Sequence, residues 1–164
     1  MRSDIPTPQP LPHFTLPERR WGVFFSRDES SGPERQPPHS PRILIVEDDF
    51  LVSIQTESAL IEAGLDVTGI ATSADEAVEL ATLQRPSLVV MDIRLAGERD
   101  GIDAALQLFR EHGIRCIFAT AHSDGETRKR GNAAAPLGWL PKPYTMTSLL
   151  DMVRSALRRL GEGE

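Results

Sequence analysis

The chain has 164 residues and a net charge of −6, which allows one domain with an appendage and disfavours nonspecific binding to nucleic acid. No apolar run approaches the roughly 18 to 20 residues of a membrane-spanning helix, so no membrane association is expected. The single cysteine excludes an internal disulfide. The absence of a disulfide and of a signal-peptide pattern at the N-terminus favours a cytoplasmic location. Cys116 lies in a predicted apolar strand and is expected to be part of the core.

Residues 1–40 form a proline-rich extension. They contain eight of the chain's 13 prolines, and their five basic and five acidic side chains balance. Such a segment buries too little apolar surface to offset the entropy of ordering, which predicts disorder. An aromatic cluster of Trp21, Phe24 and Phe25 interrupts it. The cluster indicates either loose packing without a role or a short motif that docks a partner.

Strands and helices are predicted to alternate after the extension. In chain order they are strand 42–46, helix 50–63, strand 65–70, helix 73–84, strand 87–91, a loop with Gly97 and Gly101 followed by a helix that ends near Gly113, strand 114–119, helix 123–131, strand 137–140 and helix 146–160. This alternation predicts an α/β domain with a doubly wound, five-stranded parallel sheet and five helices over residues 41–160, followed by a short tail, 161–164.

Several helix boundaries carry recognisable signals. Asp49 is a predicted N-cap of the first helix, and Thr145 caps the last one. Ser73 and Glu76 have the spacing of a capping box, in which each side chain accepts a hydrogen bond from the other residue's backbone. Gly64 is the predicted C-terminal stop of the first helix. These signals place the loops that connect the strands.

Four of the predicted strands are followed by side chains that can handle phosphate. Glu47 and Asp48 follow the first strand, Asp92 the third, Thr120 the fourth and Lys142 the fifth. In an open parallel sheet, ligands bind at the carboxyl ends of the strands, so these groups should converge. The ordinary alternatives are that the acid pair caps a helix, that Asp92 starts a turn, and that Lys142 is a solvated surface lysine.

These residue types suit phosphoryl transfer. A carboxylate such as Asp92 can attack a phosphoryl group and hold it as an acyl phosphate. Three acids in one pocket repel one another unless a cation joins them, and oxygen ligands suit Mg²⁺. Lys142 supplies a compact positive charge for phosphate or carboxylate. The sequence therefore predicts a magnesium-dependent phosphoacceptor site centred on Asp92.

The order acid pair, Asp, Thr-Ala and Lys-Pro resembles the receiver domain of two-component response regulators over residues 41–160. The resemblance implies a flavodoxin-like, CheY-like sheet with strand order 2-1-3-4-5. It implies that Asp92 is the phosphoacceptor and that Thr120 and Lys142 contact the phosphoryl group. It also implies a cis peptide bond before Pro143.

The resemblance further implies how a cation is held. Mg²⁺ would contact Asp48, Asp92 and the backbone carbonyl of Arg94, with Glu47 acting through water. The Arg94 side chain lies at the rim of the pocket, and our hypothesis is that it shields the acyl phosphate from attacking water.

A second group of residues is expected to respond to the phosphoryl group. By resemblance, the Thr120 hydroxyl turns towards the phosphoryl oxygen, and an aromatic side chain on the fifth strand fills the space it leaves. That aromatic is Trp139 here, where relatives more often have Tyr or Phe, and the alternative is that Trp139 stays packed or exposed. Ala121 and His122 lie at the rim, where His122 either orients a water molecule or has no role.

Two segments depart from the family pattern. Leu95 and Ala96 replace the usual Met-Pro after the phosphoacceptor, and the loop 93–99 is one residue longer than usual. Residues 131–138 also differ from the usual Ala-Gly-Ala-rich turn, which predicts a short or mobile fourth helix.

The expected function is that of a single-domain response regulator, because the chain ends soon after the last predicted helix. It would accept a phosphoryl group from a histidine kinase or histidine phosphotransfer protein and act as a phosphoacceptor rather than an enzyme, with at most slow autodephosphorylation. A downstream protein could dock on the fourth helix, fifth strand and fifth helix. No direct nucleic-acid or membrane contact is expected, and the chain would be a monomer or a weak homodimer.

Three other functions fit parts of the sequence. A receiver-like interaction module would not need phosphorylation. A phosphatase of the haloacid dehalogenase type also uses an Asp after a strand, but Arg94 stands where it needs a second Asp. Nucleic-acid binding would rest on Arg154, Arg158 and Arg159, which also suit the negative end of a helix dipole.

Overall fold

A computed structural model describes residues 40–121 and 124–162 of the chain. Residues 1–39 of the extension, for which disorder was predicted, therefore lie outside the described part. The aromatic cluster at 21–25 and His122 also lie outside it.

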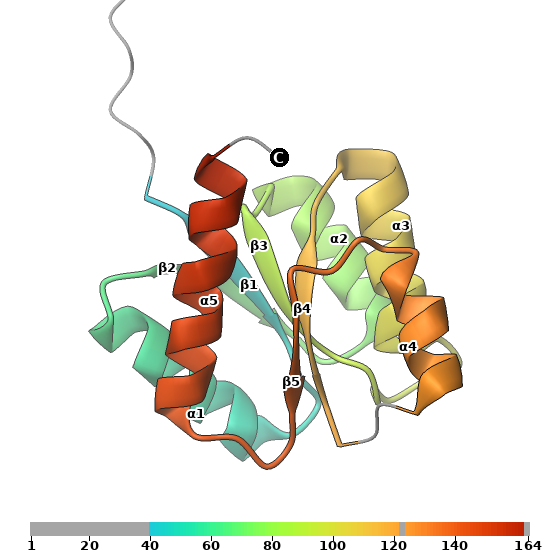
Figure 1. Ribbon diagram of the computed structural model, residues 1–164, viewed down its shortest axis with the longest axis horizontal. Coiled ribbons are helices and arrows are strands. Elements are labelled where there is room, and N and C mark those ends of the chain that lie inside the picture. Colours follow the sequence, from blue (N-terminus) through green and yellow to red (C-terminus); the bar gives the residue numbers. More distant parts are fainter. Residues whose placement is uncertain (1–39, 122–123, 163–164) are drawn as a thin grey trace, which may run out of the picture. The chain divides into compact units, whose positions relative to one another are not determined.

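The sheet has five parallel strands in the order β2-β1-β3-β4-β5 (Figure 1). They are β1 (Arg42–Val46), β2 (Asp66–Ala71), β3 (Leu88–Asp92), β4 (Cys116–Thr120) and β5 (Gly138–Pro141). The predicted fold class and strand order are confirmed. The strand order reverses at β1 and β3, so the carboxyl ends of these two strands define the crevice where ligands bind in such sheets.

Helices cover both faces of the sheet. They are α1 (Phe50–Glu62), α2 (Ala74–Gln84), α3 (Gly101–His112), α4 (Gly125–Asn132) and α5 (Met146–Gly161). Figure 1 shows α1 and α5 on one side of the sheet and α2, α3 and α4 on the other. Because both faces are covered, the three central strands, β1, β3 and β4, are buried and almost continuously apolar, whereas the edge strand β2 is only partly buried.

The core has two layers that follow the alternation of side chains along each strand. Ile43 and Ile45 of β1 pack in the layer with Leu60 of α1 and Leu149 of α5. Leu44, which lies between them in the sequence, packs with the helices of the opposite layer. Successive strand side chains point to opposite faces, so one strand serves both layers. Cys116 is buried in the second layer, as predicted.

Most helix signals are confirmed, with one correction. Asp49 accepts from the backbone amides of Leu51 and Val52, and Ser73 accepts from that of Glu76. The reciprocal half of the predicted capping box is wrong, because the Glu76 carboxylate accepts from the amide and hydroxyl of Thr72 instead.

Some predicted boundaries shift. Gly101 is the first residue of α3 rather than part of the loop before it, and α5 includes Gly161, one residue past its expected end. Helix α4 is short, as expected, with Asp124 as its N-cap.

Candidate functional site

The predicted phosphate-handling groups meet at the carboxyl end of the sheet. Asp92 and Thr120 are the last residues of β3 and β4, Glu47 directly follows β1, and Lys142 directly follows β5. Asp92 pairs with Ala119 across β3 and β4, which sets neighbouring strand ends level. The rule that placed these groups together in the sequence therefore gives the observed arrangement.

Lys142 joins the two buried acids. Its Nζ donates to Glu47 Oε2 and to Asp92 Oδ2, each at 2.6 Å. Glu47 is 5% and Asp92 7% exposed, so both carboxylates are largely removed from water. The ammonium group thus keeps two neighbouring carboxylates from facing each other unpaired. The alternative of a solvated surface lysine does not fit these contacts.

Burial and pairing compete in this site. Burial raises the pKa of the Glu47 carboxyl above its ordinary value, although the hydrogen bond from Lys142 opposes this effect. Burial alone would lower the pKa of Lys142, but the hydrogen bonds to Asp92 and Glu47 outweigh it and raise that pKa. Lys142 is therefore held as a cation at neutral pH.

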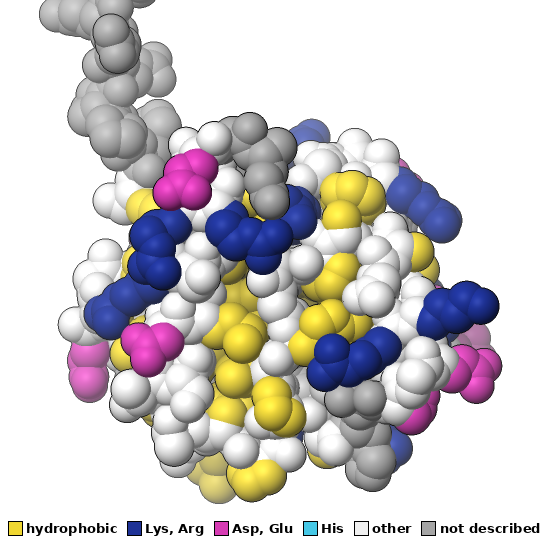
Figure 2. Space-filling model, in the orientation of Figure 1, with side chains coloured by type: hydrophobic (Ala, Val, Ile, Leu, Met, Phe, Trp, Pro, Cys, Tyr) yellow, Lys and Arg dark blue, Asp and Glu magenta, His cyan; other side chains and the backbone are white. Residues whose placement is uncertain are grey.

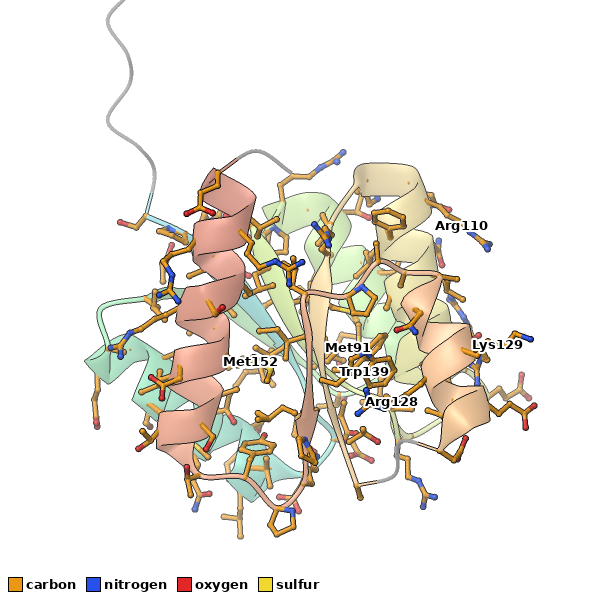
Figure 3. All side chains as sticks on the ribbon, viewed as in Figure 1. Met91, Arg110, Arg128, Lys129, Trp139 and Met152 are labelled. Carbon is orange, nitrogen blue, oxygen red and sulfur yellow. The ribbon has the colours of Figure 1, made fainter. Side chains whose placement is uncertain are left out.

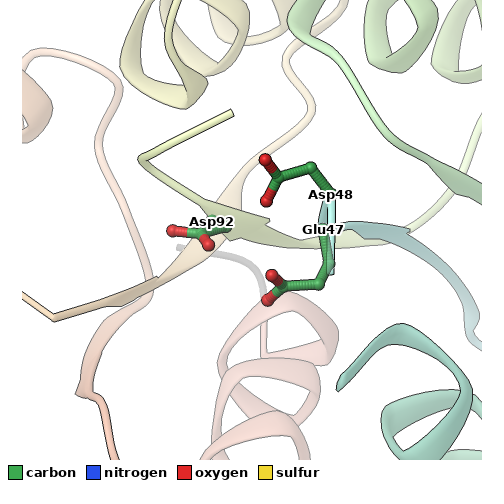
Figure 4. Close-up of side chains that lie close together, drawn as sticks. All are labelled: Glu47, Asp48 and Asp92. Carbon is green, nitrogen blue, oxygen red and sulfur yellow. The ribbon is translucent and has the colours of Figure 1, made fainter. Parts of the chain in front are cut away.

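Three carboxylates are placed to share a cation. One oxygen from each of Glu47, Asp48 and Asp92 lies within 4.8 Å of the others (Figure 4). Two of these side chains are buried and Asp48 is exposed, so the cluster opens to solvent on the Asp48 side. An oxygen-only set with an open side suits Mg²⁺, which keeps several water ligands. The donor set fits the predicted metal.

The loop after Asp92 folds back onto it. The Arg94 amide donates to Asp92 Oδ1 at 3.0 Å. The Arg94 side chain is exposed, as its predicted place at the rim requires. The roles of its carbonyl as a metal ligand and of its side chain as a shield stay predictions.

Gly101 has a structural role beside Asp92 that the sequence analysis missed. A Cβ at this residue would lie 1.9 Å from the Asp92 carbonyl oxygen, and the Gly101 amide donates to the Ile93 carbonyl at 2.9 Å. Helix α3 can therefore begin directly against the end of β3 only because residue 101 has no side chain. A signal was present, since Asp100 and Asp103 have the spacing of the capping box that α3 shows.

Trp139 packs between the sheet and α4. Its ring centroid lies 4.7 Å from that of Phe118, and the Arg128 guanidinium lies 5.1 Å from the Trp139 ring centroid (Figure 3). A Cβ at Gly131 would come within 2.6 Å of Trp139 Cη2. The indole is thus accommodated because α4 has a glycine where the ring lies, a relation that the sequence analysis did not predict. The proposed rearrangement of Thr120 and Trp139 stays a prediction.

A cavity opens beside Lys142. Its volume is about 410 Å³, and its lining includes Ala121, Pro143, Val52 and Met146. Ala121 is exposed, which agrees with its predicted place at the rim. The peptide bond before Pro143 is cis, as the resemblance implied. The cavity gives a mostly apolar entrance on the side of the pocket formed by α1 and the start of α5.

Comparison with known proteins identifies the family. Residues 43–154 match the family described as the response regulator receiver domain. The chain belongs to this family. The receiver domain is 35% identical over 121 residues to the transcriptional regulatory protein PdtaR of Mycobacterium tuberculosis, covering 74% of this chain and 58% of that protein. It is 30% identical over 130 residues to the phyllosphere-induced regulator PhyR of Methylorubrum extorquens, covering 79% and 48%. The chain thus spans about half the length of these relatives.

Solved receiver domains have the same fold. The signal receiver domain of a modulated diguanylate cyclase from Desulfovibrio desulfuricans aligns with a TM-score of 0.70 and 33% identity, over 76% of this chain and 99% of that one. A CheY-like receiver domain protein from Methanospirillum hungatei aligns with a TM-score of 0.67 and 25% identity, over the same shares. Within residues 40–121 and 124–162, no helix is long and apolar enough to cross a membrane.

Proposed function

We propose that this receiver domain accepts a phosphoryl group on Asp92 from a histidine kinase or histidine phosphotransfer protein. The observation that carries the proposal is the pairing of Lys142 with both Asp92 and Glu47 beside a three-carboxylate cluster. A site that holds one cation and has oxygen ligands for a second is suited to the spread negative charge of a transferring phosphoryl group.

In the proposed reaction, an Asp92 carboxylate oxygen attacks the phosphorus of the donor's phosphohistidine. A phosphorus–oxygen bond forms as the phosphorus–nitrogen bond breaks, and the leaving imidazole takes up a proton. Lys142 stays an ammonium and holds a phosphoryl oxygen. Mg²⁺ held by Asp48, Asp92 and the Arg94 carbonyl, with Glu47 acting through water, would neutralise the remaining oxygens. The domain acts as a phosphoacceptor in the cytoplasm rather than as a turnover enzyme, and it loses the group slowly.

The surface of α1 beside the pocket supports docking of a phosphodonor. Phe50 is 72% and Leu51 69% exposed, at the end of α1 nearest to Glu47 and Asp48. Large apolar side chains at such exposure favour a contact with another protein. With the adjoining cavity, they form an apolar rim around a polar pocket, which suits a helical donor that presents its histidine to Asp92.

We propose that the domain responds to the bound phosphoryl group in one of two ways. The domain either changes its affinity for a downstream protein on the face formed by α4, β5 and α5, or passes the phosphoryl group on. It works as a stand-alone receiver, as a monomer or a weak homodimer. The anti-anti-sigma factor PhyR of Bartonella quintana, which is 28% identical over 76% of this chain, is named for an action on a protein partner.

Intact-mass spectrometry after incubation with acetyl phosphate and Mg²⁺ tests phosphoryl uptake. We expect the wild type to gain one phosphoryl group and Asp92→Ala to gain none, because the acceptor oxygen is gone. Adding EDTA to the wild type should also prevent the gain. Uptake by Asp92→Ala, or none by the wild type, would contradict the proposal.

A phosphorylation-independent interaction module is the second candidate. The fit of the indole against Gly131 and Phe118 favours it, since a tightly packed Trp139 resists rotation. Beryllofluoride with Mg²⁺ mimics the phosphoryl group, so fluorescence of a Trp21→Phe variant, which leaves Trp139 as the only tryptophan, separates the two. A change supports the switch, and an unchanged spectrum together with no phosphoryl uptake supports the module.

A further inference from the structure

The last part of the domain carries charge of the opposite sign to the rest. Residues 40–121 contain 14 acidic and six basic side chains, a net charge of −8. Residues 124–162 contain seven basic and four acidic side chains, a net charge of +3. Most of these cations belong to α4 and α5, the helices on either side of the edge strand β5. The domain therefore has one basic face on an otherwise acidic body.

Several of these cations are available to a partner. Lys129 of α4 and Arg158 of α5 are exposed, and neither forms an ion pair or a side-chain hydrogen bond within residues 40–121 and 124–162. Arg130 differs, because it binds Asp103 of α3 and Asp100, the N-cap of that helix. Figure 2 shows dark blue side chains on both flanks of this face and few magenta ones between them. Asp151 is an exposed acid of α5 near this face.

An apolar strip lies between the two basic flanks. Trp139 of β5 and Met152 of α5 are partly buried and pack on opposite core layers. A Cβ at Gly138 would lie 2.7 Å from Met152 Sδ, so the thioether covers the start of the edge strand. Figure 2 shows hydrophobic side chains along this strip. Methionine and tryptophan adapt well to apolar side chains of a partner.

We propose that this face, defined by Arg128, Lys129, Trp139, Met152 and Arg158, binds an acidic segment of another protein. The carboxylates of the segment pair with the basic flanks, and its apolar side chains contact Trp139 and Met152. Complementary charge around an apolar centre provides both specificity and rapid association. The inference deepens the proposed function and rests on it for biological meaning, since it gives the chemistry of the downstream partner.

Two other occupants fit less well. A second copy related by a two-fold axis would place this face against itself and so oppose like charges. A nucleic acid would find only a narrow basic patch with an apolar centre, on a domain with an acidic body. Both are outcomes that the experiment can detect.

Fluorescence anisotropy with a labelled acidic peptide tests the inference on the full chain. The probe is an amphipathic helical peptide of Glu and Leu, and its control has Gln in place of Glu. We expect the Glu peptide to bind about tenfold more tightly than the Gln peptide, and high salt to weaken it. Equal affinity of the two peptides would overturn the inference.

Charge reversal locates the binding site. The double variant Lys129→Glu with Arg158→Glu should bind the Glu peptide at least about tenfold more weakly. Arg85→Glu, an exposed change at the end of α2, is the control and should bind as the wild type does. Thermal unfolding confirms that each variant folds. An equal loss of peptide affinity in Arg85→Glu, or no loss in the double variant, would overturn the assignment of the binding site to this face.

The remaining outcomes separate this inference from the phosphoacceptor function. Intact-mass phosphoryl uptake by the double variant should equal that of the wild type, because neither changed residue belongs to the Asp92 pocket. Peptide binding without wild-type uptake would refute the phosphoacceptor proposal alone. Phosphoryl uptake without peptide binding would refute only the inference of an acidic partner. Two further outcomes would overturn the acidic-partner inference. One is that the free chain dimerises and Lys129→Glu abolishes the dimer; the other is that an oligonucleotide binds more tightly than the peptide.

Discussion

Asp92 ends a strand whose five residues are all buried, whereas α4 buries only Gly131 among its eight residues. The Asp92 pocket is fixed by buried strands that pack on both faces. Helix α4 is held mainly by polar contacts at its surface and by the fit of one glycine to Trp139. This difference suits the proposed function, in which a phosphoryl group binds at one place and the response occurs at another.

The contrast has an energetic meaning. Segments with few buried apolar contacts open at lower free energy than core strands do. Under the proposed function, a change in charge at Asp92 would therefore alter the position of α4 more readily than that of the sheet. The polar contacts of α4 would set how much free energy that movement costs. The predictions that follow test each side of the comparison, beginning with the largest expected effect.

Replacing Lys142 should affect stability most. In Lys142→Met, Glu47 and Asp92 lose the ammonium that lies 2.6 Å from each. Breaking such a partly buried pair should lower the free energy of unfolding by about 2–3 kcal/mol when EDTA is present. Mg²⁺ should restore part of the loss, because it supplies a positive charge to the same carboxylates. Urea unfolding with EDTA and with Mg²⁺ measures both effects.

Lys129→Met is the matched control, because Lys129 is exposed and its change removes the same charge from α4. Its stability should stay close to that of the wild type under both conditions. If Lys142→Met were as stable as the control in EDTA, the pocket would not depend on this pair.

Gly131→Ala tests the fit between α4 and Trp139. The new Cβ would lie 2.6 Å from Trp139 Cη2, so the ring or the helix must shift. Overpacking of this kind should cost about 1–2 kcal/mol, despite the better helix propensity of alanine. Urea unfolding, followed by circular dichroism, measures the loss.

Gly125→Ala provides the control on the same helix. A Cβ at Gly125 meets nothing within 4 Å, so this change should leave stability unchanged or slightly raise it. Adding Trp139→Phe to Gly131→Ala should recover part of the loss, since the smaller ring lacks the clashing atoms. No recovery in the double variant would mean that the clash is not with Trp139.

Arg130→Met should have a smaller effect, below about 1 kcal/mol, because exposed ion pairs contribute little. Arg130 binds Asp100 at 2.6 Å and Asp103 at 3.1 Å, which ties α4 to the start of α3. Hydrogen exchange should therefore quicken in α4 and stay unchanged in β3. Equal exchange rates in α4 of the wild type and the variant would show that the contact of Arg130 with Asp100 and Asp103 does not stabilise α4.

The strand ends could be predicted from the sequence because a single physical rule applies to them. Continuous apolar runs mark strands buried on both faces, and ligands bind where such strands end. Lys142, Asp92 and Glu47 follow those runs directly, so their convergence needed no knowledge of loops. The error at Glu76 has a local cause, because its carboxylate reached Thr72, one residue before the predicted partner.

The contacts around α4 could not be predicted in the same way. Gly131 and Trp139 are close in sequence, but their fit depends on the angle at which the helix meets the sheet. Arg130 meets Asp100 from 30 residues away, and nothing in either local sequence specifies the other. Surface pairs of this kind follow from tertiary structure and do not leave a periodic pattern.

The N-cap of α4 gives the smallest and most local prediction. The Asp124 carboxylate accepts from the Thr127 amide, and this hydrogen bond lowers the pKa of Asp124 below its ordinary value of 3.8. A lowered pKa means that the cap stabilises the folded helix fully above the ordinary value and loses its effect as the pH falls through the lowered one. The chemical shift of the Thr127 amide should follow this titration with a midpoint below 3.8. In Asp124→Asn, which keeps an accepting oxygen without the charge, the titration should be absent. A midpoint at or above the ordinary value would show that the cap does not hold the start of α4.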